Sequence, residues 1–187
     1  DAGGATVLGS ADNVFIGYQS GGGTWTTAVS EYNVGLGNYT LDAALNGALY
    51  NTALGYAALT DLTTGGSNIA IGHGAMDDTD AGSNSLGTTD NIFIGLDAGG
   101  GTWADSASGY NIGIGNYVLD GALAAANYNV GIGHIALSAV SSGDSNVGIG
   151  KGAGAALTTA IGNIAIGTDA MLVHTTGGNN TVIGYGA

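Results

Sequence analysis

Residues 129–137 read NVGIGHIAL, and close variants of this stretch recur along the whole chain. Each copy begins with Asn, continues with Val, Ile or Thr, then a residue that is mostly small, then Ile or Leu, then Gly. The spacings between successive repeat asparagines are 20, 18, 17, 23, 20, 18, 17, 17 and 17 residues. A period of this length is typical of a solenoid, in which each repeat forms one coil stacked on the last. The repeat asparagines are Asn13, Asn33, Asn51, Asn68, Asn91, Asn111, Asn129, Asn146, Asn163 and Asn180.

Each copy contains the alternating pattern of a short β-strand. The residues one and three places after Asn share one face of that strand, and the residue between them points the other way. We expect the larger aliphatic residues to stack in columns and to enclose a dry core. The small residue between them lets another backbone come close, so we expect an axis between chains to run along that column. The column three places after Asn comprises Ile16, Leu36, Leu54, Ile71, Ile94, Ile114, Ile132, Ile149, Ile166 and Ile183.

Glycine follows every strand, which favours a sharp corner with positive φ or close packing. A second short segment follows, such as Ala136-Leu137, and a polar turn such as TTGGSN at residues 63–68 closes the coil. The asparagine after each turn is expected to hydrogen-bond through its side-chain amide along its own column. These patterns predict an all-β protein, a parallel β-solenoid (β-roll) of about ten coils of 17–20 residues, with two short strands per coil.

A larger duplication contains these coils. A shift of 78 residues lays residues 13–82 over residues 91–160 with about half of the positions identical. The segment GGGTW at 21–25 recurs at 99–103. We therefore assign residues 1–187 to a single β-solenoid array, with tandem four-coil blocks at 5–82 and 83–160 and two further coils at 161–187. Because the chain starts without Met and stops within a repeat, we expect it to be part of a longer protein.

The amino-acid composition limits the kinds of molecule that the chain can bind. The chain has 187 residues, of which 38 are Gly and none is Pro or Cys, and 44% are hydrophobic, which favours an ordered fold over disorder. The formal net charge is −13 with a single basic residue, which excludes binding to nucleic acid or to an anionic membrane. The chain has no long uninterrupted apolar stretch, so we expect no membrane insertion of this segment. Because a coil this narrow encloses little apolar surface, we expect a homo-oligomer, specifically a homotrimer.

The repeat N-[VIT]-[AG]-[IL]-G-x-x-A resembles the head repeats of trimeric autotransporter adhesins and the repeats of bacteriophage tail-fibre proteins. The stretch NTALGYAALTDLTTGGSNIAIGHGAM at 51–76 is especially similar to phage and prophage chains, and the resemblance covers residues 6–187. It implies three chains side by side in an extracellular fibre on a virion or a bacterial surface. The implied partners are other fibre, virion or cell-surface proteins and a host surface glycan or protein.

The expected function is therefore a structural or receptor-binding segment of a trimeric fibre, without enzyme activity and without a cofactor. A purely structural extracellular filament, with subunits stacked end to end through their solenoid edges, is the alternative. Ice binding is less favoured because regular Thr-x-Thr ranks are missing from the sequence. A hydrolase is also less favoured, because no paired carboxylates recur with a suitable geometry.

The sequence gives little support for a metal-binding or phosphate-binding site. His73 and His134 occupy the same repeat position three coils apart, about 14 Å at the usual strand spacing, so within one chain they cannot share a metal ion. Lys151, in GIGKGAG at 148–154, is followed by Gly and not by Ser or Thr, which argues against a phosphate loop. A weak Ca²⁺ candidate is the acidic loop with Asp77, Asp78 and Asp80, but a solvated turn is favoured because the full ligand pattern is missing.

Aromatic residues provide the remaining candidate site. Trp25 and Trp103 follow triple-glycine turns in long coils, where exposed rings would offer platforms for sugars. The favoured alternative is that each Trp folds back over its coil or fills a groove between subunits, because an aromatic ring of this size rarely stays bare. The tyrosines that would extend a glycan platform are Tyr18, Tyr39, Tyr56 and Tyr117.

Overall fold

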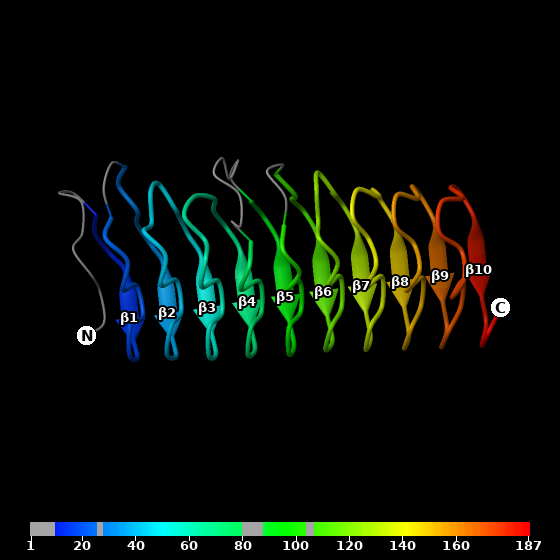
Figure 1. Cartoon of the computed structure of the whole chain (residues 1–187), viewed down its shortest axis with the longest axis horizontal. Coiled ribbons are helices and arrows are strands. Elements are labelled where there is room, and N and C mark those ends of the chain that lie inside the picture. The colour runs from blue at the N-terminus through cyan, green and yellow to red at the C-terminus, as the bar shows by residue number, and fades with distance from the viewer. Residues whose placement is uncertain (1–9, 26–27, 80–87, 104–106) are drawn as a thin grey trace.

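A computed structural model of the chain describes residues 10–25, 28–79, 88–103 and 107–187. These residues form an all-β parallel solenoid without a helix, as the repeat pattern predicted. Ten strands pair in chain order in a single sheet and lie side by side along the long axis (Figure 1). The strands are β1 (Val14–Ile16), β2 (Val34–Leu36), β3 (Thr52–Leu54), β4 (Ile69–Ile71), β5 (Ile92–Ile94), β6 (Ile112–Ile114), β7 (Val130–Ile132), β8 (Val147–Ile149), β9 (Ile164–Ile166) and β10 (Thr181–Ile183).

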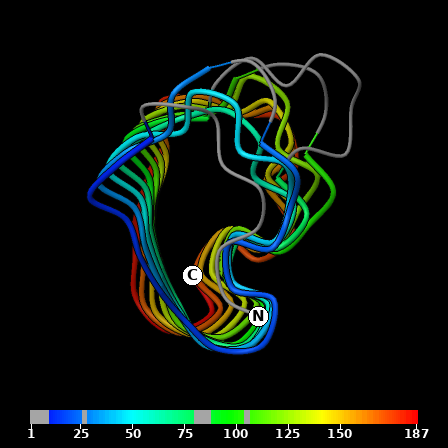
Figure 2. The same ribbon diagram turned by 90° about the vertical axis from the view of Figure 1, so that its left-hand side faces the viewer.

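Equivalent positions of successive coils are aligned without a shift. Ile114 of β6 pairs with Ile94 of β5 and with Ile132 of β7, and the other strands follow the same register. Seen along the axis, successive coils follow similar paths with a gradual offset on the strand side and in the lower turn, and their described upper segments follow less similar paths (Figure 2). The strands therefore stay stacked in register although the coils differ in length.

Each coil contains one strand within the described residues, so the expectation of a second strand was wrong. The second segment still bonds to its neighbours, but in alternating directions. The Tyr39 N–H donates to the Tyr18 carbonyl of the preceding coil, and the Leu41 N–H donates to the Ala58 carbonyl of the following coil. Positive φ angles of 60° at Tyr39 and 49° at Leu41 prevent the extended geometry of a strand.

The strands face the opposite way from the prediction. The middle residue of each strand, which is small in most coils, points into the coil, and Ala53, Ala70 and Ala165 are fully buried. The aliphatic residues on either side point outward: Ile16 is 59% exposed and Leu36 is 45% exposed. The columns of aliphatic residues therefore form, but they lie on the outside of the single chain. The small column accordingly lies within the coil and cannot be an axis between chains.

The narrowness of the coil explains this orientation. A Cβ atom added to Gly148 would lie 2.7 Å from Cγ of the buried Leu137, and one added to Gly113 would lie 2.5 Å from the Phe93 ring. The second segment contributes the larger core side chains, such as Leu119 and Met171, and these already fill the space opposite the strand. A Val or Ile in the middle of most strands would overpack the interior.

The repeat asparagines form the ladder that the sequence predicted. In each step, the backbone N–H and the Nδ2 group of one Asn both donate to Oδ1 of the Asn in the preceding coil. For Asn111, these donor–acceptor distances to Oδ1 of Asn91 are 2.9 and 3.1 Å, and Nδ2 also donates to the Ala126 carbonyl at 2.9 Å. Eight of the ten side chains are fully buried, so the ladder supplies hydrogen bonds that solvent cannot replace.

Glycine at the end of each strand meets both of its expected roles. Gly133 has a φ of 133°, a region that other residues avoid. A Cβ atom at this position would also lie 2.6 Å from the Gly150 carbonyl oxygen of the next coil. The corner therefore needs glycine for its dihedral angle and for the close approach of two backbones.

Candidate functional site

Both tryptophans are buried, so neither offers a ring to a ligand on the surface. Trp25 is 4% exposed and Trp103 is 1% exposed. The Nε1–H group of Trp103 donates to the Gly99 carbonyl at 2.9 Å, whereas that of Trp25 has no acceptor among the described residues. The glycan platform proposed for Trp25 and Trp103 is therefore wrong, and the alternative that they fold over their coils is confirmed.

A pair of phenylalanines explains why the tryptophans turn inward. Phe93 occupies the inner strand position that is small in most coils, and Trp103 packs against its ring edge-to-face with centroids 5.8 Å apart. A Cβ atom on Gly99 would lie 2.8 Å from the Phe93 ring, so the triple-glycine turn makes room for this aromatic pair. Phe15 and Trp25 repeat the arrangement in the first block at 5.8 Å. The signal was the coincidence of an inner Phe with GGGTW in the same coil.

Three of the four predicted tyrosines form a surface row with one histidine. Tyr39 contacts Tyr18 and Tyr56 edge-to-face, with ring centroids 5.4 and 5.5 Å apart, and Tyr56 stacks on His73 at 5.1 Å. Tyr117 lies in the second block and contacts His134 instead, at 6.1 Å. The structure therefore brings Tyr18, Tyr39 and Tyr56 together and places Tyr117 in a separate cluster.

A second aromatic row was not predicted from the sequence. Tyr32 and Tyr50 stack in parallel with their ring centroids 5.0 Å apart, and Tyr110 and Tyr128 do the same at 5.0 Å in the second block. All four rings are exposed, and each tyrosine directly precedes a ladder asparagine. That shared position, repeated after 78 residues, was the available signal, because residues at equivalent positions of a solenoid stack on each other.

The acidic residues gather across coils rather than within one loop. Asp77 and Asp97 both lie against Gly74, although they are 20 residues apart in sequence. Partial burial and the neighbouring Asp97 carboxylate raise the pKa of Asp77 to about 6. Burial also raises the pKa of Asp120, with a further contribution from Asp97. The pKa values of Asp77 and Asp120 are therefore higher than those of carboxyl groups in an exposed acidic turn.

The structure describes only part of the proposed calcium-binding loop. Asp78 accepts a hydrogen bond from the Thr102 hydroxyl, and Asp80 lies outside the described residues. Among the residues that the structure describes, no three His, Asp or Glu side chains are placed to share a metal ion. His73 lies 3.8 Å from the Asp97 carboxylate, an exposed contact between Nδ1 and Oδ1. Lys151 is exposed at the same repeat position as His73 and His134.

One side of the solenoid presents a long apolar surface. The side chains one and three places after each ladder asparagine, which we call the aliphatic face, run along all ten strands. They are exposed or half-buried from Val14 and Ile16 at one end to Ile183 at the other. Monomeric proteins seldom leave a contiguous apolar patch of this extent in contact with water, and such patches mark interaction sites.

Comparison of the chain with protein-family models, with curated proteins and with solved structures gives no match. The part of the chain that the structure describes contains no helix able to cross a lipid bilayer. The chemistry and geometry of the surface are therefore the basis for a functional proposal.

Proposed function

We propose that this chain is a structural and receptor-binding segment of an extracellular trimeric fibre, either a phage tail fibre or a cell-surface adhesin, that attaches to a glycan or protein on a host surface. The observation that carries the proposal is the aliphatic face. It follows the whole rod on one side, so it suits a partner that is equally long and straight. A second and third copy of the same chain have that shape.

The composition of the aliphatic face favours assembly between identical chains. Burying a single Val, Leu or Ile side chain contributes about 1.5–3 kcal/mol, and each coil presents one or two side chains of this kind. Charged residues are absent from these positions in all ten coils. Parallel copies around a rotation axis would place their aliphatic faces against each other and leave the acidic surfaces in water. The number three comes from the resemblance to adhesin heads and tail fibres.

The aromatic rows support an attachment role. Tyr18, Tyr39, Tyr56 and His73 form a connected surface of rings along four successive coils. Exposed aromatic rings bury large areas on binding and recognise both sugars and protein surfaces. The assembly would repeat such a surface on each chain, and repetition raises the overall avidity of weak contacts.

Sedimentation velocity tests the assembly. Three chains of 18.0 kDa predict a species of about 54 kDa. The double variant Ile114→Asp with Ile132→Asp puts charges at neighbouring positions of the aliphatic face, and we expect it to sediment at the monomer mass with an unchanged far-ultraviolet circular dichroism spectrum. The matched control is Ala44→Asp with Ala122→Asp, two exposed positions outside the aliphatic face in equivalent coils.

The outcomes separate the candidates. A wild-type monomer, or a trimer that survives the double substitution, would contradict assembly through the aliphatic face. A broad distribution of much larger species that grows with concentration would favour the end-to-end filament over the trimer.

A further inference from the structure

The row of residues that directly precede the ladder asparagines is interrupted after two stacked rings. Tyr32 covers one face of the Tyr50 ring at a centroid distance of 5.0 Å. The next coil has Ser67 at this position and the coil after that has Asp90, so no third ring continues the stack. The face of Tyr50 that Tyr32 does not cover lies on the side of Ser67, and the tyrosine is 57% exposed.

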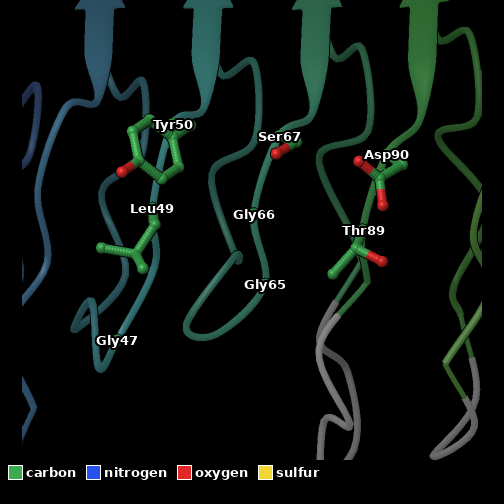
Figure 3. Close-up of a pocket in the computed structure, with 8 residues that line it drawn as sticks. All are labelled: Gly47, Leu49, Tyr50, Gly65, Gly66, Ser67, Thr89 and Asp90. Carbon is green, nitrogen blue, oxygen red and sulfur yellow. The ribbon is translucent and has the colours of Figure 1, made fainter.

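An open groove occupies this place, with a volume of about 320 Å³. Tyr50, Ser67 and Asp90 lie in a row across three coils just before β3, β4 and β5, above Leu49, Gly66 and Thr89 (Figure 3). Parallel backbone bridges join Leu49 to Gly66 and Gly66 to Thr89, so the base of the groove is held in place. We call this feature the Tyr50 groove. Its volume falls at the lower end of the range for small-molecule sites, about 300–1,000 Å³.

We propose that the Tyr50 groove binds a neutral pyranose ring of a surface glycan. A pyranose has an apolar face of C–H groups that packs on an aromatic ring, and its edge carries hydroxyl groups that need hydrogen-bond partners. Tyr50 supplies the ring, the Asp90 carboxylate supplies a strong acceptor, and Ser67 and Thr89 supply hydroxyls. The inference rests on the proposed attachment function and assigns its ligand chemistry to one place on the surface.

Charge selects neutral sugars over acidic ones. The chain has a formal net charge of −13, and Asp90 itself lines the groove. The single basic side chain, Lys151, lies after β8, three strands beyond β5. A sialic acid, a uronic acid or a phosphorylated sugar would meet repulsion here without a compensating cation.

A similar row, which runs from Tyr110 to Gly162, lacks the acceptor. Tyr110 and Tyr128 stack at 5.0 Å and Ser145 follows, as Ser67 follows Tyr50. The next residue of the row is Gly162 in place of Asp90. This second row therefore serves as an internal control for a site that needs both an aromatic ring and a carboxylate.

Ser67→Tyr is the decisive variant, because the new ring would continue the stack and fill the groove. Ser67 has a φ of 59°, and Tyr50 adopts 60° at the equivalent position, so the backbone accepts tyrosine there. Tyr50→Ala removes the platform. Ser145→Tyr makes the equivalent change in the second block, at a φ of 58°. Circular dichroism checks that each variant is folded.

Ligand-observed saturation-transfer NMR would use methyl glucopyranoside, methyl galactopyranoside and methyl mannopyranoside, with N-acetylneuraminic acid as the acidic comparison. We expect the wild type to bind at least one neutral glycoside and not the acid. We expect Ser67→Tyr to abolish the signal, Tyr50→Ala to weaken binding by about tenfold or more, and Ser145→Tyr to leave it unchanged.

Failure to bind any of the three neutral glycosides, or equal binding by Ser67→Tyr and wild type, would overturn the inference. Sedimentation of the same samples separates this result from the proposed assembly. A trimer that binds no sugar retains the fibre proposal and rejects the groove. A change of mass in Ser67→Tyr, with sugar binding retained, would assign Tyr50 to contacts between chains and would also overturn the inference.

Discussion

Asp77 shows how a single residue is controlled by coils that are distant in sequence. Its carboxyl group lies beside Asp97 of the next coil and is about half withdrawn from solvent, which together raise its pKa to about 6. The sequence drew attention to Asp77 because Asp78 and Asp80 follow closely. Its strongest charged neighbour, however, is 20 residues away and comes close through the stacking of coils. Side-chain neighbours of this kind become predictable only once the coil positions are aligned.

We predict that Asp77→Asn stabilises the protein at neutral pH. Because the folded-state pKa is raised, protonated Asp77 contributes stability that is present below about pH 4 and is lost as the pH rises through about 6. Asparagine imitates the neutral form, so the gain should be on the order of 1 kcal/mol at pH 7.5, after allowing for solvent screening, and should vanish near pH 3.5. Thermal unfolding at both pH values measures it.

Asp90→Asn is the control, since it removes the same charge from an exposed position. An equal gain in both variants at pH 7.5 would attribute the effect to net charge and not to the pairing of Asp77 with Asp97.

The strand and its asparagine ladder show which element properties can be read from the sequence. The period located all ten strands, the register and the ladder, because these follow from the repeat alone. The direction of the strand faces was wrong, because the usual rule places larger apolar residues inside. Inside this coil, Leu119 and Leu137 already fill the space, and only a small residue fits opposite. The width of a coil is a three-dimensional quantity that hydrophobic alternation does not contain.

We predict that Asn111→Ala lowers the free energy of unfolding by about 2–4 kcal/mol. The substitution leaves the Ala126 carbonyl and the Asn129 backbone N–H without their present partners in a buried position. Chemical denaturation measures the loss. The matched control is Asn180→Ala at the exposed end of the same column, where we expect a loss below about 1 kcal/mol. Similar losses at both positions would mean that burial does not set the strength of the ladder.

At the scale of the whole molecule, the solenoid is a series of interchangeable coils. Residues 146–162 form one complete repeat from Asn146 to the residue before Asn163. Among the described strands, each contacts only its neighbours in the order of the sheet, so removing a full repeat leaves equivalent surfaces to meet.

We predict that deletion of residues 146–162 yields a folded rod. Asn163 would then donate to Asn129, and the longest dimension measured by small-angle X-ray scattering should fall by about 4.8 Å. Deletion of residues 146–154 alone is the comparison, because half a coil breaks the register and should abolish the β-sheet signal in circular dichroism. Loss of folding in the full-repeat deletion would show that the coils are not equivalent.

The alignment of the strand hydrogen bonds with the long axis has a mechanical consequence. Tension applied to the two ends of the rod would act on the interfaces between coils in series, so that each interface would bear the full force. The rod would then unfold one coil at a time, beginning at the least stable coil. Each step would release the contour length of roughly 17 residues, about 58 Å. A rod built in this way would dissipate mechanical work as it unfolds coil by coil. Its maximum extension would increase with each repeat in the array.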